Sequence, residues 1–100
     1  MFIVQYATTP HAADHNQHLI QQVFAELHSQ QPAGFAYASL RLADGVSFVH
    51  LVQADGDRTP LDGLGAFQRF QEGIGERITG PPVRSDATIV GSYRLLPEPE

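Results

Sequence analysis

The amino-acid sequence predicts an α+β fold in which a four-stranded antiparallel sheet carries two helices on one face. Segments rich in β-branched and aromatic residues alternate with segments of helical periodicity in the order β-α-β-β-α-β. An Asp-Gly pair joins the two middle strand segments, which is typical of a hairpin. Right-handed crossovers then place both helices on the same side of the sheet, which is the ferredoxin-like arrangement.

The first part of the chain is predicted to be a strand followed by a helix. Residues 2–8 are rich in β-branched and aromatic side chains, and Thr9-Pro10 supplies a helix cap with proline at the first helical position. Residues 10–30 have a helical period, and Pro32 excludes Gln31 from the right-handed helix, so the helix should end there. The side chains expected on its buried side are Ala12, Asn16, Leu19, Ile20, Val23, Phe24 and Leu27.

A hairpin is predicted over residues 35–43 and 46–54, with Asp44-Gly45 as a two-residue type I′ turn. This loop fixes the register, so residue 43 pairs with 46, 41 with 48, 39 with 50 and 37 with 52. One face of the hairpin then carries Tyr37, Ser39, Arg41, Phe48, His50 and Val52. The other face carries Ala36, Ala38, Leu40, Leu42, Ser47, Val49, Leu51 and Gln53.

A polar loop over residues 55–59 leads into the second helix, which repeats the start signal of the first at Thr59-Pro60. Apolar side chains recur at helical spacing, and four glycines weaken the helix by up to about 1 kcal/mol each. The apolar set is Leu64, Phe67, Phe70, Ile74 and Ile78, and the glycines are Gly63, Gly65, Gly73 and Gly75. Residues 80–82 end the helix, and residues 83–95 are predicted to form a long last strand before a frayed tail.

Length and composition narrow the classes of protein. The 100 residues predict a single domain over 1–100, with an ordered core over about 2–95 and a tail over 96–100. The chain has only six basic residues and a net charge of −5, which argues against nucleic acid or an anionic membrane as a partner. The absence of cysteine excludes disulfides, thiolate metal sites and a cysteine nucleophile. With neither a signal peptide nor a membrane-length apolar run, we expect a cytoplasmic protein.

Large apolar residues occur on both faces of the predicted strands, for example Val4 and Tyr6 against Ile3. A solvated sheet face should be polar at every second position. A second copy packed face to face would cover the excess apolar surface. We therefore expect a homodimer through the sheet face, a dimeric α/β barrel, with a monomer whose sheet is partly hydrated as the alternative.

The residues best suited to chemistry surround His50, which lies within an apolar strand and therefore needs hydrogen-bond partners. In the predicted register Ser39 is opposite, and Tyr37 and Arg41 are diagonal neighbours. Such a cluster binds an oxyanion and moves protons near neutral pH, with His50 as base and Arg41 or Tyr37 holding the anion. The alternative is a structural histidine in a polar seam. The candidate ligand-binding residues are Ser39, Tyr6 and Arg94.

Three histidines recur on one side of the first helix, at His11, His15 and His18. This spacing can chelate zinc or copper, but the side is the solvated one and no nearby group would orient the ligands. We interpret the histidines as an exposed polar stripe and expect no metal site.

Several segments together resemble the small dimeric α/β-barrel proteins akin to the antibiotic biosynthesis monooxygenase group. These segments are FIVQYATTP, NQHLIQQVFAELHSQQPAGFAYASLRLADGVSFVHL, FQRFQEGIGERITGPP and VGSYR, which span residues 2–95. The resemblance implies a dimeric barrel and cofactor-free oxidation of polyphenols, haem degradation or small-molecule isomerisation. It also implies a pocket between sheet and helices. His50 is inferred from the residues and not from this resemblance.

Two questions stay open at this point. The first question is the function. The chain is an enzyme acting on a small aromatic or carbonyl compound without a cofactor, or a non-enzymatic dimer that binds a small molecule or another protein. A third alternative is a purely structural dimer. The apolar set Ala38, Leu40, Val49 and Leu51 favours the helix-packing face, which would direct His50 toward the dimer side, whereas the resemblance directs it toward the helices. The pattern alone slightly favours the dimer side.

Overall fold

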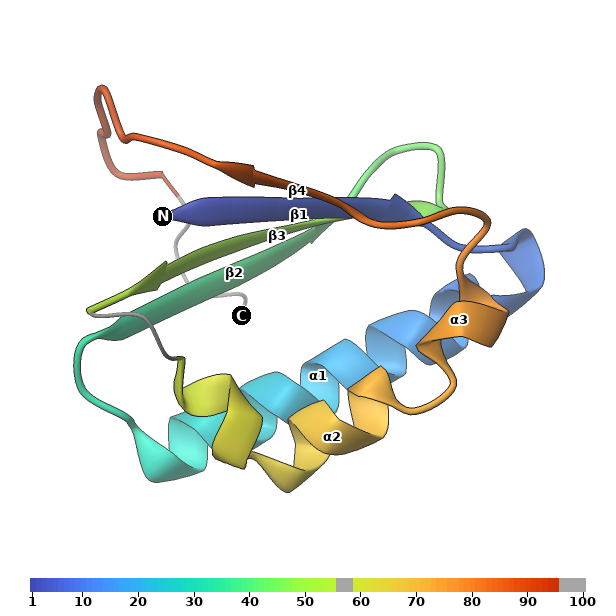
Figure 1. The fold of residues 1–100 in the computed structure, drawn as a ribbon, viewed down its shortest axis with the longest axis horizontal. Helices are drawn as coiled ribbons and strands as arrows, with labels where there is room; N and C mark the ends of the chain where they lie inside the picture. The colour runs from blue at the N-terminus through green and yellow to red at the C-terminus, as the bar shows by residue number, and fades with distance from the viewer. Residues whose placement is uncertain (56–58, 96–100) are drawn as a thin grey trace.

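The structure, a computed structural model, describes residues 1–55 and 59–95 and has the predicted α+β architecture. The strands are β1 (Phe2–Ala7), β2 (Phe35–Arg41), β3 (Ser47–Ala54) and β4 (Val83–Asp86). The helices are α1 (Ala13–Gln30), α2 (Gly65–Gln71) and α3 (Ile74–Arg77), with short 3-10 turns at Pro10–Ala12 and Pro60–Gly63. The sheet has the order β2-β3-β1-β4 with every pair antiparallel, and the helices lie against one of its faces (Figure 1).

The first helical segment begins and ends where the sequence predicts. The Thr9 hydroxyl accepts a hydrogen bond from the Ala12 amide at 3.2 Å, which caps the 3-10 turn leading into α1. Gln31 terminates α1 in the left-handed region, with φ of 48°, and its amide donates to the Leu27 carbonyl at 2.7 Å. The chain can therefore reverse at Pro32 and enter β2.

The hairpin has the predicted register but a different turn. Ser39 pairs with His50 and Arg41 with Phe48, as predicted. The type I′ turn is wrong, because only Gly45 has a positive φ, at 80°. The Asp44 carboxylate accepts hydrogen bonds from the amides of residues 46 and 47 at 2.9 and 2.8 Å, which holds this residue at negative φ. The strands consequently end at residue 41 and begin again at residue 47.

The second helical segment is divided rather than continuous, which corrects the prediction of one helix. Gly73 adopts φ of 71° between α2 and α3, and an L-residue rarely takes this conformation. The Thr59 side chain makes no capping hydrogen bond, so the predicted hydroxyl cap is wrong. Residues 56–58 of the predicted polar loop lie outside the described residues.

The last strand is much shorter than the predicted 83–95. β4 pairs with β1 only as far as the Asp86–Phe2 pair, after which the Ala87 amide donates to the Met1 carbonyl at 2.9 Å. Residues 87–95 then leave the sheet (Figure 1). The predicted tail at 96–100 lies outside the described residues.

The two sheet faces differ in what covers them. The face toward the helices buries Tyr6, Phe48 and Val52. These side chains belong to the hydrophobic core, which also contains Ile20 and Phe70. The other face exposes Leu40 and Leu42 by 38% and 45%, and no helix of the described residues lies on it (Figure 1). None of the helices within residues 1–55 and 59–95 is both long and apolar enough to cross a membrane.

Candidate functional site

His50 lies on β3 beneath the helices, with only 4% of its surface exposed. Its ring is 5.9 Å from that of Phe70 of α2, measured between centroids. The slight preference for the dimer side is therefore wrong. His50 shares a side with Phe48 and Val52, and these bulky side chains fill the space under α1 and α2, whereas the smaller apolar set faces outward.

Three of the predicted site residues make hydrogen bonds to the ring nitrogens of His50. Nε2 lies 2.9 Å from the Tyr6 hydroxyl. Nδ1 lies 2.6 Å from the Tyr37 hydroxyl and 2.8 Å from Ser39 Oγ. Both phenol rings stack beside the imidazole, with centroids 5.3 Å (Tyr6) and 5.7 Å (Tyr37) away. The imidazole thus bridges two phenols from β1 and β2, and the predicted polar seam is buried at Tyr6 and His50 and half-buried at Tyr37 and Ser39.

Two further residues extend this cluster and were not among the predicted site residues. Asn16 of α1 is completely buried, and its Nδ2 donates to the Tyr6 hydroxyl at 2.9 Å. The Arg77 guanidinium, from α3, donates from Nε to Asn16 Oδ1 at 3.0 Å. The position of Asn16 on the apolar side of the predicted helix could have identified it as a candidate site residue. Arg77 had no comparable signal, since it lies in a segment with an interrupted period.

Backbone contacts hold Arg77 at this position. The Thr9 amide donates to the Arg77 carbonyl at 2.9 Å, which ties α3 to the end of β1. The guanidinium also donates to the carbonyls of Phe70 and Glu72 at the end of α2. Carbonyls at a helix C-terminus favour a cation, and they compensate this charge where no carboxylate of residues 1–55 and 59–95 forms a salt bridge with Arg77.

Burial sets the protonation states of the cluster. It lowers the pKa of His50 to about 4, so the imidazole is neutral at physiological pH. Burial raises the pKa of Tyr6 to about 12, against the opposing effects of the Asn16 hydrogen bond and the Arg77 charge. It also raises the pKa of Tyr37. The result is a neutral base between two protonated phenols, an arrangement able to pass a proton along the cluster.

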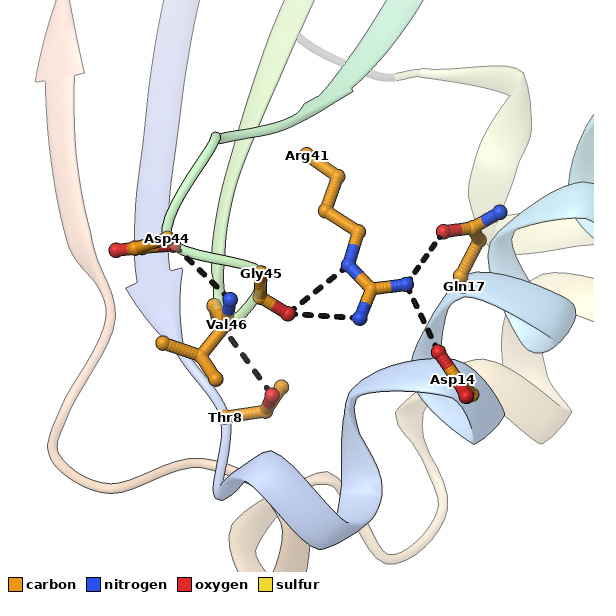
Figure 2. A network of polar contacts seen from close by, with 7 residues as sticks. All are labelled: Thr8, Asp14, Gln17, Arg41, Asp44, Gly45 and Val46. Atoms are coloured by element: carbon orange, nitrogen blue, oxygen red, sulfur yellow. Dashed lines mark hydrogen bonds and ion pairs between the residues drawn. The ribbon is translucent and has the colours of Figure 1, made fainter.

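Arg41, a predicted catalytic candidate, is engaged elsewhere (Figure 2). Its NH1 donates to Asp14 Oδ1 at 3.0 Å and to Gln17 Oε1 at 2.8 Å, and Nε and NH2 donate to the Gly45 carbonyl at 2.9 and 2.7 Å. No hydrogen bond joins Arg41 to His50 in the described part of the chain. In this structure Arg41 therefore connects the hairpin turn to the start of α1.

Arg94 lies outside the cluster. It follows β4 in the exposed segment 87–95, with φ of 51°, and its guanidinium carbon is 5.1 Å from the centroid of the Tyr93 ring. The structure thus brings together four of the six predicted site residues, and Arg41 and Arg94 are not among them. The histidine stripe at His11, His15 and His18 is exposed, and the described residues contain no group of three or more side chains that could hold a metal ion.

The described residues form an open hollow of about 340 Å³. Its lining includes Gln5, Ser47, Val49, Thr79 and Val83, together with Tyr6 and Phe48 from the helix-facing side of the sheet. His50 is not among the lining residues, although its hydrogen-bond partner Tyr6 is.

Several solved structures match this fold over most of the chain. Rv0793 from Mycobacterium tuberculosis is 20% identical, with coverage of 92% of this chain and 96% of its own and a TM-score of 0.66. An antibiotic biosynthesis monooxygenase is 23% identical, with coverage of 88% and 97% and a TM-score of 0.64. A candidate antibiotic biosynthesis monooxygenase from Nitrosomonas europaea is 13% identical, with coverage of 84% and 83% and a TM-score of 0.65.

The chain has the fold of the antibiotic biosynthesis monooxygenase-like proteins. The predicted resemblance and the ferredoxin-like fold class are therefore confirmed. No protein-family profile matches the sequence. No curated protein matches it either. At identities of 13–23% the comparisons establish the fold alone, and the chemistry has to be argued from the cluster around His50.

Proposed function

We propose that this protein is a monooxygenase-like enzyme that oxidises a small phenolic aromatic compound with O2 and without a bound cofactor. The observation that carries the proposal is the neutral His50 imidazole held between two phenol hydroxyls on the helix side of the sheet. A neutral imidazole accepts the proton of a substrate phenol, and the resulting phenolate and imidazolium stabilise each other in a medium of low dielectric constant.

The reaction balances with O2 as the only co-reactant. In an anthrone-type substrate the deprotonated ring system is electron-rich enough to reduce O2. One oxygen atom becomes the new C=O group at a ring CH2, and the other leaves as water with the two hydrogens of that carbon. His50 holds the phenolic proton while the anion reacts and returns it to the product. The side chains Tyr6, Tyr37 and Ser39 hold the imidazole in place.

Oxygen uptake with a panel of phenols tests this proposal, and dithranol, a dihydroxyanthrone, is the first probe. We expect turnover above the rate without enzyme, and a loss of about 100-fold or more in His50→Gln. His28→Gln is the matched control, because His28 is exposed at the end of α1. Full turnover in His50→Gln would remove His50 from the mechanism. An absence of turnover with every phenol would overturn the enzymatic proposal.

A second candidate function is a non-enzymatic dimer that binds a small molecule in the open hollow. The favouring observation is that the hollow is open and has polar groups from Gln5, Ser47 and Thr79 among apolar ones. A thermal-shift screen of small metabolites tests this function. Stabilisation by a compound that Thr79→Arg abolishes would support it, and no stabilisation by any compound would count against it.

For either function we propose a homodimer in which a second copy covers the open sheet face. Leu40, Leu42 and Val83 are exposed by 38–62% on or beside this face. In the segment beyond β4, Val90 and Tyr93 are 99% and 80% exposed. Large apolar side chains gathered on and beside one sheet face favour burial, and two-fold association covers such a face economically.

The mass in solution tests the dimer. Light scattering should give twice the 10.9 kDa of one chain at micromolar concentration. Leu40→Asp, which introduces a charge on the open face, should shift the mass toward 10.9 kDa, and Gln21→Asp on the exposed side of α1 should leave it unchanged. A mass of 10.9 kDa for the unmodified protein would refute the proposal.

A further inference from the structure

The hydrogen bonds around His50 form a chain with a defined direction. Arg77 Nε carries a hydrogen and can only donate, so the atom of Asn16 that faces it is the carbonyl oxygen Oδ1. The amide nitrogen of Asn16 then faces the Tyr6 hydroxyl and donates to its oxygen at 2.9 Å. The Arg77 charge therefore determines the orientation of the Asn16 amide.

This direction continues through Tyr6 to the imidazole. The Tyr6 oxygen already accepts from Asn16, so its single hydrogen is available to His50 Nε2 at 2.9 Å. If Nε2 carried the hydrogen instead, the Tyr6 hydroxyl hydrogen would have no acceptor in a side chain that is only 8% exposed. The hydrogen of the neutral imidazole then resides on Nδ1, where the Tyr37 and Ser39 oxygens lie at 2.6 and 2.8 Å.

We propose that Asn16 and Arg77 are positioning residues that hold His50 as the Nδ1–H tautomer, with the Nε2 lone pair directed at Tyr6. The chemical consequence rests on the proposed function: a substrate proton reaches His50 by way of Tyr6. The substrate O–H proton moves to the Tyr6 oxygen as the Tyr6 proton moves to Nε2. The products are a substrate phenolate and an imidazolium, and no other reactant is needed.

Nuclear magnetic resonance of the full chain with 15N-labelled histidine tests the tautomer directly. At neutral pH we expect a pyrrole-type Nδ1 and a pyridine-type Nε2 for His50. Asn16→Asp places a carboxylate beside Arg77 that accepts but cannot donate, so the Tyr6 hydroxyl should turn toward it. Nε2 then loses its donor, and the tautomer should change to Nε2–H. Gln21→Glu, which adds the same charge on the exposed side of α1, should leave the tautomer unchanged.

Each outcome decides the proposal. A pyrrole-type Nε2 in the unmodified protein would overturn it without any variant. An unchanged Nδ1–H signal in Asn16→Asp would remove the positioning role. If Asn16→Asp does not fold, Tyr6→Phe removes the same donor to Nε2, and a purely Nδ1–H imidazole in that variant would contradict the proposal.

Oxygen uptake separates this proposal from the proposed function. Asn16→Asp should lower kcat by about 100-fold with KM nearly unchanged, because the substrate meets the same surface but the base has the wrong tautomer. A tautomer change in the variant together with no turnover by the unmodified protein would support the positioning role and reject the oxidation. A tautomer change with full turnover would show that the proton does not pass through Tyr6.

Discussion

Acidification should destabilise this protein through His50, and the structure indicates by how much. Burial lowers the pKa of His50 to about 4, from the ordinary value of 6.5 expected in the unfolded chain. Between these two values the unfolded state binds a proton that the native state does not. Stability is therefore complete above about pH 6.5, falls as the pH decreases to about 4, and changes no further below it through this group.

The magnitude follows from the size of the shift. Each pKa unit corresponds to about 1.4 kcal/mol, so the shift from 6.5 to about 4 amounts to about 3 kcal/mol. The total free energy of unfolding of a domain is about 5–15 kcal/mol. For a domain of this size, 3 kcal/mol corresponds to a decrease in Tm of roughly 12–24 °C. The expected contribution of His50 is therefore a substantial fraction of the total free energy of unfolding.

Urea unfolding of the native sequence and of His50→Gln, followed by circular dichroism from about pH 7.5 to about pH 4, measures this contribution. The other histidines and all carboxylates are present in both proteins, so the difference in unfolding free energy isolates His50. Equal protein concentrations keep any contribution from association constant. We expect the advantage of the native sequence to shrink by about 3 kcal/mol over this range. A difference that stays constant with pH would mean that His50 titrates alike in both states, which would refute the argument from burial.

Five further substitutions have defined outcomes. Tyr6→Phe should cost about 2–4 kcal/mol in urea unfolding, because it leaves Asn16 Nδ2 and His50 Nε2 without partners. Tyr37→Phe should cost about 1 kcal/mol, because Ser39 still makes a hydrogen bond to Nδ1. A larger loss of stability in Tyr37→Phe than in Tyr6→Phe would contradict this hydrogen-bond network. Arg41→Met should lower the free energy of unfolding by about 1 kcal/mol, because it removes the contacts to Asp14, Gln17 and the Gly45 carbonyl. An Arg41→Met variant with unchanged stability but no turnover would instead return Arg41 to the catalytic set. Gly73→Ala should cost about 1–2 kcal/mol at φ of 71°, whereas Gly75→Ala, with open space around it, should be stabilising by up to about 1 kcal/mol. Equal melting temperatures for the two glycine variants would show that the break between α2 and α3 is not enforced by backbone conformation.

The fold was largely predictable because its strongest signals are local. Thr9-Pro10 and Gln31-Pro32 mark the ends of the first helical segment, and the structure ends it within a residue of those positions. The hairpin register follows from the period of two along each strand and from the position of Gly45. The turn type was not predictable from the Asp-Gly pair alone, because the Asp44 carboxylate binds two amides and keeps its own backbone at negative φ.

The orientation of His50 could not be read from periodicity. Alternation says which residues share a face but does not say which face meets the helices when both faces are apolar. The structure places the face with Tyr6 and Phe48 inward, where large rings fill the layer between sheet and helices. The end of β4 depends on the pairing with Met1, a contact distant in sequence. Arg77 was missed for the same reason, since its role depends on α1 and α3 meeting at Asn16.

The composition of the buried cluster itself supports a chemical role. Tyr6, Asn16 and His50 lie within a core of aromatic and aliphatic side chains, and each polar group of the described cluster has a hydrogen-bond partner. A network that is fully paired is tolerated, yet apolar side chains of similar volume would stabilise such a core at least as well. Stability therefore does not explain why an asparagine, an arginine and an imidazole meet beneath this sheet. The charge of Arg77 instead gives the chain of hydrogen bonds a direction, and a directed chain ending on a neutral imidazole is what a proton-transfer site requires.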